Sequence, residues 1–245
     1  MQDHFNQQST SQHRYGLNWI NTILFVVGKP VKLQESALHT TPWLTRIMIV
    51  LISFISILAW MPEFREPMFN AFAFYPDASG GQWFAGLFTC AVLHGGWAHL
   101  LGNMYFFWLF GRHVECRFGR RRMIGLFLIA TALGAWIHGM FSEAPLVGAS
   151  GGIFGVLAFY ALLFPKSRIL WVPFVGFFLR IFMLNWDFIR KGFPVRVYLG
   201  VFMAYQVVLL HSQLFGDGNV SALGHLGGGL AGVVIYFGWQ RGLLP

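Results

Sequence analysis

Six almost uncharged apolar stretches, each 18 or 19 residues long, constrain the fold of this chain more than any other feature. They cover residues 44–61, 92–110, 123–141, 147–164, 197–214 and 221–239. A membrane-spanning helix needs about 20 predominantly apolar residues, with some tolerance. The only Asp, Glu, Lys or Arg inside them is Arg46, at an end from which its side chain can reach the interface. The sequence therefore predicts an all-α polytopic membrane protein with six transmembrane helices.

The composition agrees with this class. Of the 245 residues, 56% are hydrophobic and 11% are charged, whereas soluble domains carry about 25% charge. This excludes an ordinary soluble globule and a disordered chain. The net charge of +8 would suggest nucleic acid in a soluble protein, but in a membrane protein it indicates basic cytoplasmic loops, so no nucleic-acid partner is expected. Cys90 and Cys116 make neither a disulfide framework nor a zinc cluster, and we expect no metal or cofactor.

The basic residues set the expected orientation. All but one of the 17 Lys and Arg lie in the N-terminal segment, the second connection, the fourth connection or the C-terminus. The other three connections hold Arg65 alone among the basic residues. Since cytoplasmic loops carry the excess of Lys and Arg, both termini are predicted to be cytoplasmic. The expected location is a bacterial inner (plasma) membrane.

Three segments outside the six stretches need separate interpretations. Residues 1–43 are expected to form a cytoplasmic or interfacial N-terminal segment, with an interfacial helix at 17–27, ahead of a membrane domain at 44–241. The apolar segment 169–184 could be a seventh span. We expect an interfacial or re-entrant insert instead, because a crossing would carry the basic residues that follow it to the outside. Residues 82–91 are too apolar for a solvated loop and are expected to lie partly in the membrane.

Polar side chains inside the membrane are costly, so each one invites a functional question. With the orientation above, five of the nine histidines fall in the outer halves of the predicted spans, although random placement would scatter them over both halves. This pattern suggests a polar cavity open to the outside. The five are His94, His99, His138, His211 and His225.

His99 and Asn103 are spaced four residues apart, in the stretch HGGWAHLLGN. They therefore share one helix face, about 6 Å apart along the axis. Both side chains can donate hydrogen bonds, either to a ligand or, as the alternative, to a neighbouring helix. His94 lies at the mouth of the same predicted helix, where it could equally anchor the chain at the interface.

Ser150 lies among glycines, in the stretch VGASGGIFG, with Gly148 two residues before it. Small residues in a transmembrane helix usually allow close packing. They also leave room for a substrate carbonyl to approach a hydroxyl nucleophile. The motif alone leaves both interpretations open.

His225 lies in ALGHLGGGLAG, and Gly228 and Gly232 share its helix face. Such a glycine stripe lets another helix approach closely, and the helix that carries Ser150 has small residues to meet it. On its own, His225 could be a packed histidine with a backbone partner. However, Ser150 and His225 both lie about 6 Å below the predicted start of their spans. This matching depth on separate helices favours one shared site.

Taken together, three motifs resemble the rhomboid family of intramembrane serine proteases. They are HGGWAHLLGN, GASGGIFG and GHLGGGLAG, and the resemblance covers residues 44–241. It implies a six-transmembrane-helix rhomboid-like bundle in which Ser150 is the nucleophile and His225 the general base. His99 and Asn103, with the Ser150 backbone N–H, would hold the oxyanion.

The resemblance also implies supporting roles around the site. His94 would lie near its mouth, and the ring of Phe154 would pack on the imidazole. Glu115 would be a structural acid at the end of the second span. One departure is that Trp83 is followed by Phe84, where many members have a Trp-Arg pair.

The implied activity is endoproteolysis of transmembrane segments near the outer membrane face, through a Ser-His dyad and an acyl-enzyme. Transmembrane proteins and the lipid bilayer would be the partners, and nothing in the sequence indicates an oligomeric state. No Asp or Glu lies inside a span, so packing must orient the imidazole. Two alternatives are a non-catalytic rhomboid-like protein that binds transmembrane clients and a small transporter or channel.

Overall fold

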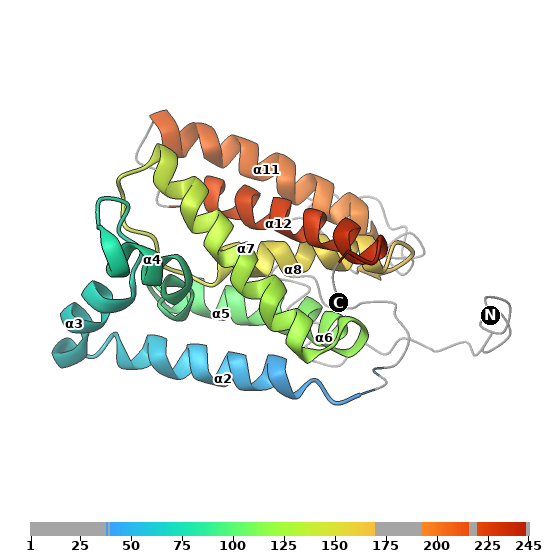
Figure 1. Cartoon of the computed structure of the whole chain (residues 1–245), viewed down its shortest axis with the longest axis horizontal. Coiled ribbons are helices and arrows are strands. Elements are labelled where there is room, and N and C mark those ends of the chain that lie inside the picture. The colour runs from blue at the N-terminus through green and yellow to red at the C-terminus, as the bar shows by residue number, and fades with distance from the viewer. Residues whose placement is uncertain (1–37, 39, 170–192, 216–219, 244–245) are drawn as a thin grey trace, which may run out of the picture. The chain divides into compact units, whose positions relative to one another are not determined.

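The structure is a computed structural model that describes residue 38 and residues 40–169, 193–215 and 220–243. All the described helices belong to one compact unit, residues 35–167 and 194–245. The expected interfacial helix at 17–27 and all of the insert 169–184 except Ile169 lie outside the described residues, and the division at residues 43 and 44 stays a prediction. The described elements are α2 Trp43–Leu58, α3 Pro62–Phe72, α4 Gly80–Thr89, the 3-10 turn η2 Cys90–Val92, α5 Trp97–Phe106, the π turn η3 Phe107–Gly111, α6 Arg112–Phe118, α7 Arg120–Phe141, α8 Ser150–Leu163, the two-residue strands β1 Arg168–Ile169 and β2 Phe193–Pro194, α11 Val195–Phe215 and α12 Ala222–Gln240 (Figure 1).

The described residues are mainly helical, and the chain is a multi-pass membrane protein. Among the described residues, α7, α11 and α12 are each long and apolar enough to cross a bilayer. Two bent pairs raise the number of candidate spans to five: α2 with α3, bent by 120°, and α4–η2 with α5–α6, bent by 82°. The apolar helix α8 has 14 residues and is shorter than a usual span. Each of the six predicted stretches contains a helix. By length and composition, however, the described helices support three to five membrane spans and not six.

The second predicted stretch differs most from expectation. We expected one helix from Val92, but the chain turns after η2 and helix α5 begins only at Trp97. The reason lies in Gly95 and Gly96, since consecutive glycines favour an irregular backbone over a helix. From Trp97 the helical path then continues through η3 and α6 to Phe118, eight residues beyond the predicted end. His94 therefore lies in the turn and not in a helix.

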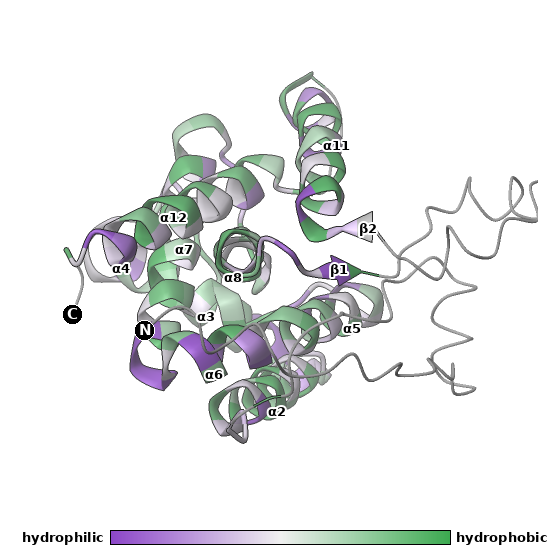
Figure 2. Ribbon diagram, turned by 90° about the vertical axis from the view of Figure 1, so that its right-hand side faces the viewer, coloured by the Kyte–Doolittle hydropathy of each residue, from purple (hydrophilic) through white to green (hydrophobic). Residues whose placement is uncertain are grey.

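Many exposed side chains of the helices are large and hydrophobic, as contact with lipid requires, and much of the helical ribbon is coloured hydrophobic in Figure 2. Large hydrophobic side chains are exposed on several helices, including Phe54 on α2, Val208 on α11 and Val234 on α12. In water such a surface would promote aggregation, whereas in a bilayer it is the surface expected to contact lipid.

Helix α8 is the central helix of the bundle and is buried from Gly152 to Ala161 (Figure 2). Helix α12 packs directly on it through the glycine stripe. A Cβ atom on Gly228 would collide with the carbonyl oxygen of Gly151, and one on Gly232 with that of Gly155. In membrane proteins, small residues at a helix interface let the two backbones approach this closely.

We expect Gly228→Ala to lower the thermal unfolding midpoint in detergent by several degrees. The new methyl group must displace the backbone of α8, and overpacking of this kind costs about 1–3 kcal/mol. Gly125→Ala on α7 is the matched control, because a Cβ there meets nothing within 4 Å. Equal midpoints for the two variants would contradict this packing.

Glu115, on α6, connects three helices: α2, α6 and α7. Its buried carboxylate accepts hydrogen bonds from the backbone N–H groups of Leu44 and Thr45, at 2.9 and 2.7 Å, and from the Thr45 hydroxyl. It also contacts the Arg120 guanidinium at 3.3 Å. A carboxylate at a helix N-terminus satisfies orphan N–H groups and complements the helix dipole. Glu115 thus holds the start of α2 against α6 and α7.

Candidate active site

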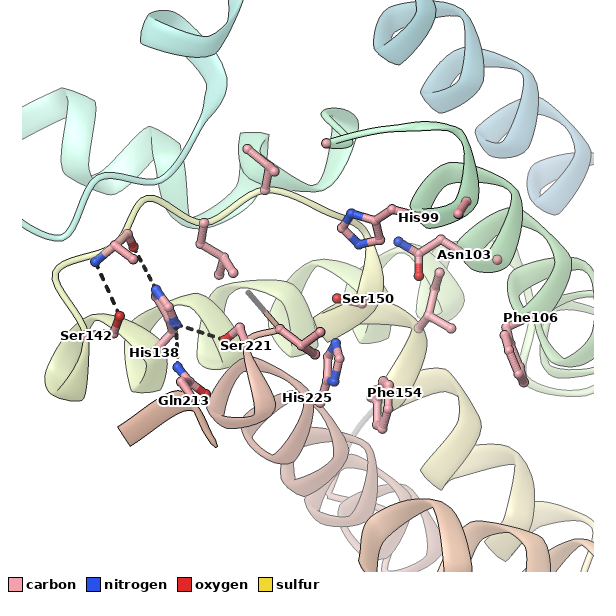
Figure 3. Close-up of a pocket in the computed structure, with 18 of the residues that line it drawn as sticks. His99, Asn103, Phe106, His138, Ser142, Ser150, Phe154, Gln213, Ser221 and His225 are labelled. Atoms are coloured by element: carbon pink, nitrogen blue, oxygen red, sulfur yellow. Dashed lines mark hydrogen bonds between the residues drawn. The ribbon is translucent and has the colours of Figure 1, made fainter. Parts of the chain in front are cut away.

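A cavity of about 860 Å³ opens among α5, α8, α12 and the segment before α8. This size is typical of a small-molecule or substrate pocket. Its wall carries six of the side chains that the sequence singled out: His99, Asn103, His138, Ser150, Phe154 and His225 (Figure 3). The residues from three helices that looked related only by depth therefore share one cavity.

Ser150 is the first residue of α8, and not a residue one turn inside a helix as expected. The reason is Gly148, whose φ of +125° is a conformation that other residues rarely adopt. The Gly148 N–H donates to the Cys90 carbonyl at 2.9 Å, and Leu146 pairs with Phe74, so the approach to Ser150 is held as an extended strap. At a helix start the Ser150 N–H has no intrahelical acceptor and can bind a ligand.

Gly148 also brings His99 close to Ser150. A Cβ on Gly148 would lie 2.7 Å from Cε1 of His99 and 3.7 Å from the Ser150 hydroxyl oxygen. No other residue type would fit between the imidazole and the strap. The side chains of His99 and Ser150 therefore face the same part of the cavity (Figure 3).

Asn103 is held from behind by His94. The Asn103 amide nitrogen lies 2.9 Å from Nε2 of His94, and Nδ1 of His94 lies 2.9 Å from the Ser56 hydroxyl. Since that hydroxyl donates its only proton to the Val92 carbonyl, it accepts from Nδ1–H of His94, which leaves Nε2 to accept from Asn103. His94 is fully buried. The sequence predicted His94 at the mouth of the site, but the residue lies behind Asn103.

His225 is held on two sides. Its imidazole stacks on the Phe154 ring, with centroids 4.2 Å apart and planes within 4°. Phe154 in turn stacks on Phe202 of α11 at 5.0 Å. Nδ1 of His225 lies 2.7 Å from Oε1 of Gln206. The structure records no hydrogen bond between His225 and Ser150, although both side chains line the cavity.

The remaining histidines divide. His138 lines the cavity and contacts the Ala144 carbonyl and the Ser221 hydroxyl, both at 2.8 Å. His211 does not line it: the side chain is exposed on α11 against the ring of Phe215. Of the five histidines in the predicted outer halves, His99, His138 and His225 line the cavity, whereas His94 and His211 do not.

Gln206 and Ser56 are contacts that the sequence reasoning missed. Each is a polar side chain in a predicted span, so the signal used for the histidines could also have flagged them. Both are buried and both hydrogen-bond a histidine. No group of three or more His, Cys, Asp or Glu in the described part of the chain is arranged to bind a metal ion.

Comparison with known proteins gives the family. The model of the Rhomboid domain matches residues 80–241, about two thirds of the chain. The chain belongs to the rhomboid family. This rhomboid domain begins at α4 and contains the whole cavity wall described above, while α2 and α3 precede the matched region.

Individual relatives match shorter parts. "Rhomboid protease GluP" of Bacillus subtilis is 35% identical over 96 residues, 39% of this chain and 19% of that protein. "RHOMBOID-like protein 1" of Arabidopsis thaliana is 40% identical over 72 residues, 29% of this chain and 18% of that protein. "Uncharacterized protein Rv1337" of Mycobacterium tuberculosis is 31% identical over 168 residues, 65% of this chain and 60% of that protein. The chain thus spans from about a fifth to three fifths of these relatives.

Proposed function

We propose that this protein is an intramembrane serine endopeptidase that cleaves transmembrane segments of other membrane proteins. Membership of the rhomboid family suggests this class of activity. The observation that carries the proposal is the shared cavity, in which Ser150 at a helix start and His225, stacked on Phe154, line one wall. Ser150 would be the nucleophile and His225 its general base.

In this mechanism, Ser150 Oγ attacks the scissile carbonyl carbon while Nε2 of His225 takes the hydroxyl proton. The tetrahedral intermediate collapses as the C–N bond breaks and His225 returns the proton to the leaving amine. Water, activated by the same imidazole, then hydrolyses the serine ester. The missing hydrogen bond between Ser150 and His225 fits a site without substrate, since such contacts often tighten only when substrate binds.

Three donors would stabilise the oxyanion. They are the backbone N–H of Ser150, the His99 imidazole and the Asn103 amide. The N-terminus of α8 adds its partial positive charge. Asn103 has two amide hydrogens and spends one on His94, so the second stays available for the developing charge.

The proposal is tested by incubating purified protein with tagged single-span substrates and mapping the products by mass spectrometry. We expect wild type to cleave inside the membrane segment. His99→Ala and Asn103→Ala should each lower kcat/KM by about 10²–10³-fold, the usual effect of losing an oxyanion donor. Leu101→Ala, an exposed site on the same helix, is the control. If no substrate is cut, or if the two variants match Leu101→Ala, the assignment fails.

We also propose six spans with both termini in the cytoplasm of a bacterium. A structural fact supports a common side for the two reactive helices: His138, near the end of α7, contacts both Ala144 before α8 and Ser221 before α12. Both helices therefore begin at one end of the bundle. The positive-inside bias puts that end outside, and cleavage would occur near the outer membrane face.

Single-cysteine labelling in intact cells checks this orientation. In a background without Cys90 and Cys116, cysteines replacing Glu143 and Val220 should react with a membrane-impermeant thiol reagent. Cysteines replacing Arg121 and Arg241 should react only after permeabilisation. Labelling of Glu143 and Val220 from opposite sides would contradict both the topology and the Ser150–His225 pairing.

A further inference from the structure

We infer that Gln206 is a positioning residue that fixes the imidazole of His225 in the tautomer a general base needs. The inference rests on the proposed function, because it concerns the base of that site. It replaces the expectation that packing alone orients His225. The juxtaposition that carries it is a buried amide on α11 against Nδ1 of a histidine on α12.

The contact is short and shielded from water. Oε1 of Gln206 lies 2.7 Å from Nδ1 of His225, and Gln206 is only 2% exposed. Gln206 does not line the cavity, whereas His225 does. The amide therefore holds the side of the imidazole that faces away from the cavity, where no substrate or cavity water competes for it.

The direction of the hydrogen bond follows from the second contact of the amide. Nε2 of Gln206 lies 3.4 Å from the Phe202 carbonyl, which can only accept. The nitrogen must therefore face Phe202 and the oxygen must face His225. An oxygen can only accept, so Nδ1 of His225 carries the proton. In a neutral imidazole this leaves the lone pair on Nε2, the nitrogen that must take the proton of Ser150.

The two contacts of His225 restrain different motions. The stack on Phe154 sets the plane of the ring but allows rotation within it and either tautomer. The Gln206 contact removes the rotation and selects the tautomer. Stacking alone would leave a fraction of the protein with the proton on Nε2, and that fraction cannot act as a base.

A neutral amide also suits this location better than a carboxylate. A buried Asp or Glu would bring a charge into an apolar region, at a large desolvation cost. Glutamine accepts the same hydrogen bond without that charge. The chain thus has the third group of a Ser-His-acid arrangement in uncharged form, on a helix that supplies neither the nucleophile nor the base.

Gln206→Met tests the role, because methionine keeps the shape of the side chain but has no acceptor oxygen. We expect kcat to fall roughly 10- to 100-fold with KM little changed, which is less than the 10²–10⁴-fold that general-base catalysis supplies as a whole, because the base itself remains. Gln206→Glu, which restores an acceptor oxygen, should recover part of the loss. Gln240→Met is the matched control: the same change at an exposed glutamine at the end of α12, outside the cavity. Its kcat should stay near that of wild type.

A wild-type kcat for Gln206→Met, or equal losses for the Met and Glu variants, would overturn the inference. If a variant fails to fold, the inference can still be tested, because the tautomer of His225 can be measured in the wild-type protein. In ¹⁵N spectra of histidine-labelled protein, the signal absent from His225→Gln should show a protonated Nδ1 and an unprotonated Nε2. The reverse pattern would refute the role of Gln206. Undiminished cleavage by Ser150→Ala would instead refute the proposed function, so the two failures are distinguishable.

Discussion

Ser150→Ala is expected to abolish cleavage of every transmembrane substrate, with a loss on the order of 10⁶-fold in kcat, the size seen when a serine nucleophile is removed. The change deletes one oxygen at the start of α8 and makes almost no cavity, so the thermal midpoint should stay at the wild-type value. The rate with purified variant and a tagged single-span substrate checks this.

Ser142→Ala is the matched control for this variant. Ser142 lines the same cavity, and its hydroxyl accepts from the Ala144 backbone N–H at 3.3 Å. We expect it to cleave at nearly the wild-type rate. Residual cleavage by Ser150→Ala at more than trace level would remove Ser150 from the mechanism.

The second large effect is expected for His225→Gln. Glutamine can still donate a hydrogen bond to Gln206, so little buried polarity is left unpaired, but an amide cannot take the proton of Ser150. Cleavage should fall by a factor similar to that of Ser150→Ala, because members of one catalytic unit are not additive. The double variant should be no slower than either single variant.

His211→Gln serves as its control. His211 is exposed on α11 and does not line the cavity, so the same substitution there should leave cleavage unchanged. If His225→Gln retained the wild-type rate, another base would have to serve Ser150, and the proposed dyad would be wrong.

The apolar pattern predicts where the helices lie, because a spanning helix must be predominantly apolar. It predicts their ends poorly. The start of α8 depends on the positive φ of Gly148, and a hydropathy average cannot register one backbone angle. The turn before α5 is hidden for the same reason, since Gly95 and Gly96 lie inside an apolar stretch.

The residues of the site were indicated by their types and spacing, but their mutual contacts were not. The i, i+4 spacing of His99 and Asn103 follows from helix geometry alone. In contrast, the Gln206–His225 contact depends on how α11 and α12 are rotated about their axes, and no local pattern encodes that rotation. The same holds for Ser56, which reaches His94 only because α2 packs beside η2.

The most direct measurement for the central claim is the site of modification by a fluorophosphonate, which reacts with an activated serine hydroxyl. Wild-type protein in detergent is treated with the probe, digested and mapped by mass spectrometry. We predict one adduct per chain, on Ser150, and its loss in His225→Gln because the hydroxyl is no longer activated. An adduct on a different residue, or protein that cleaves substrate while Ser150 stays unmodified at saturating probe, would contradict the account.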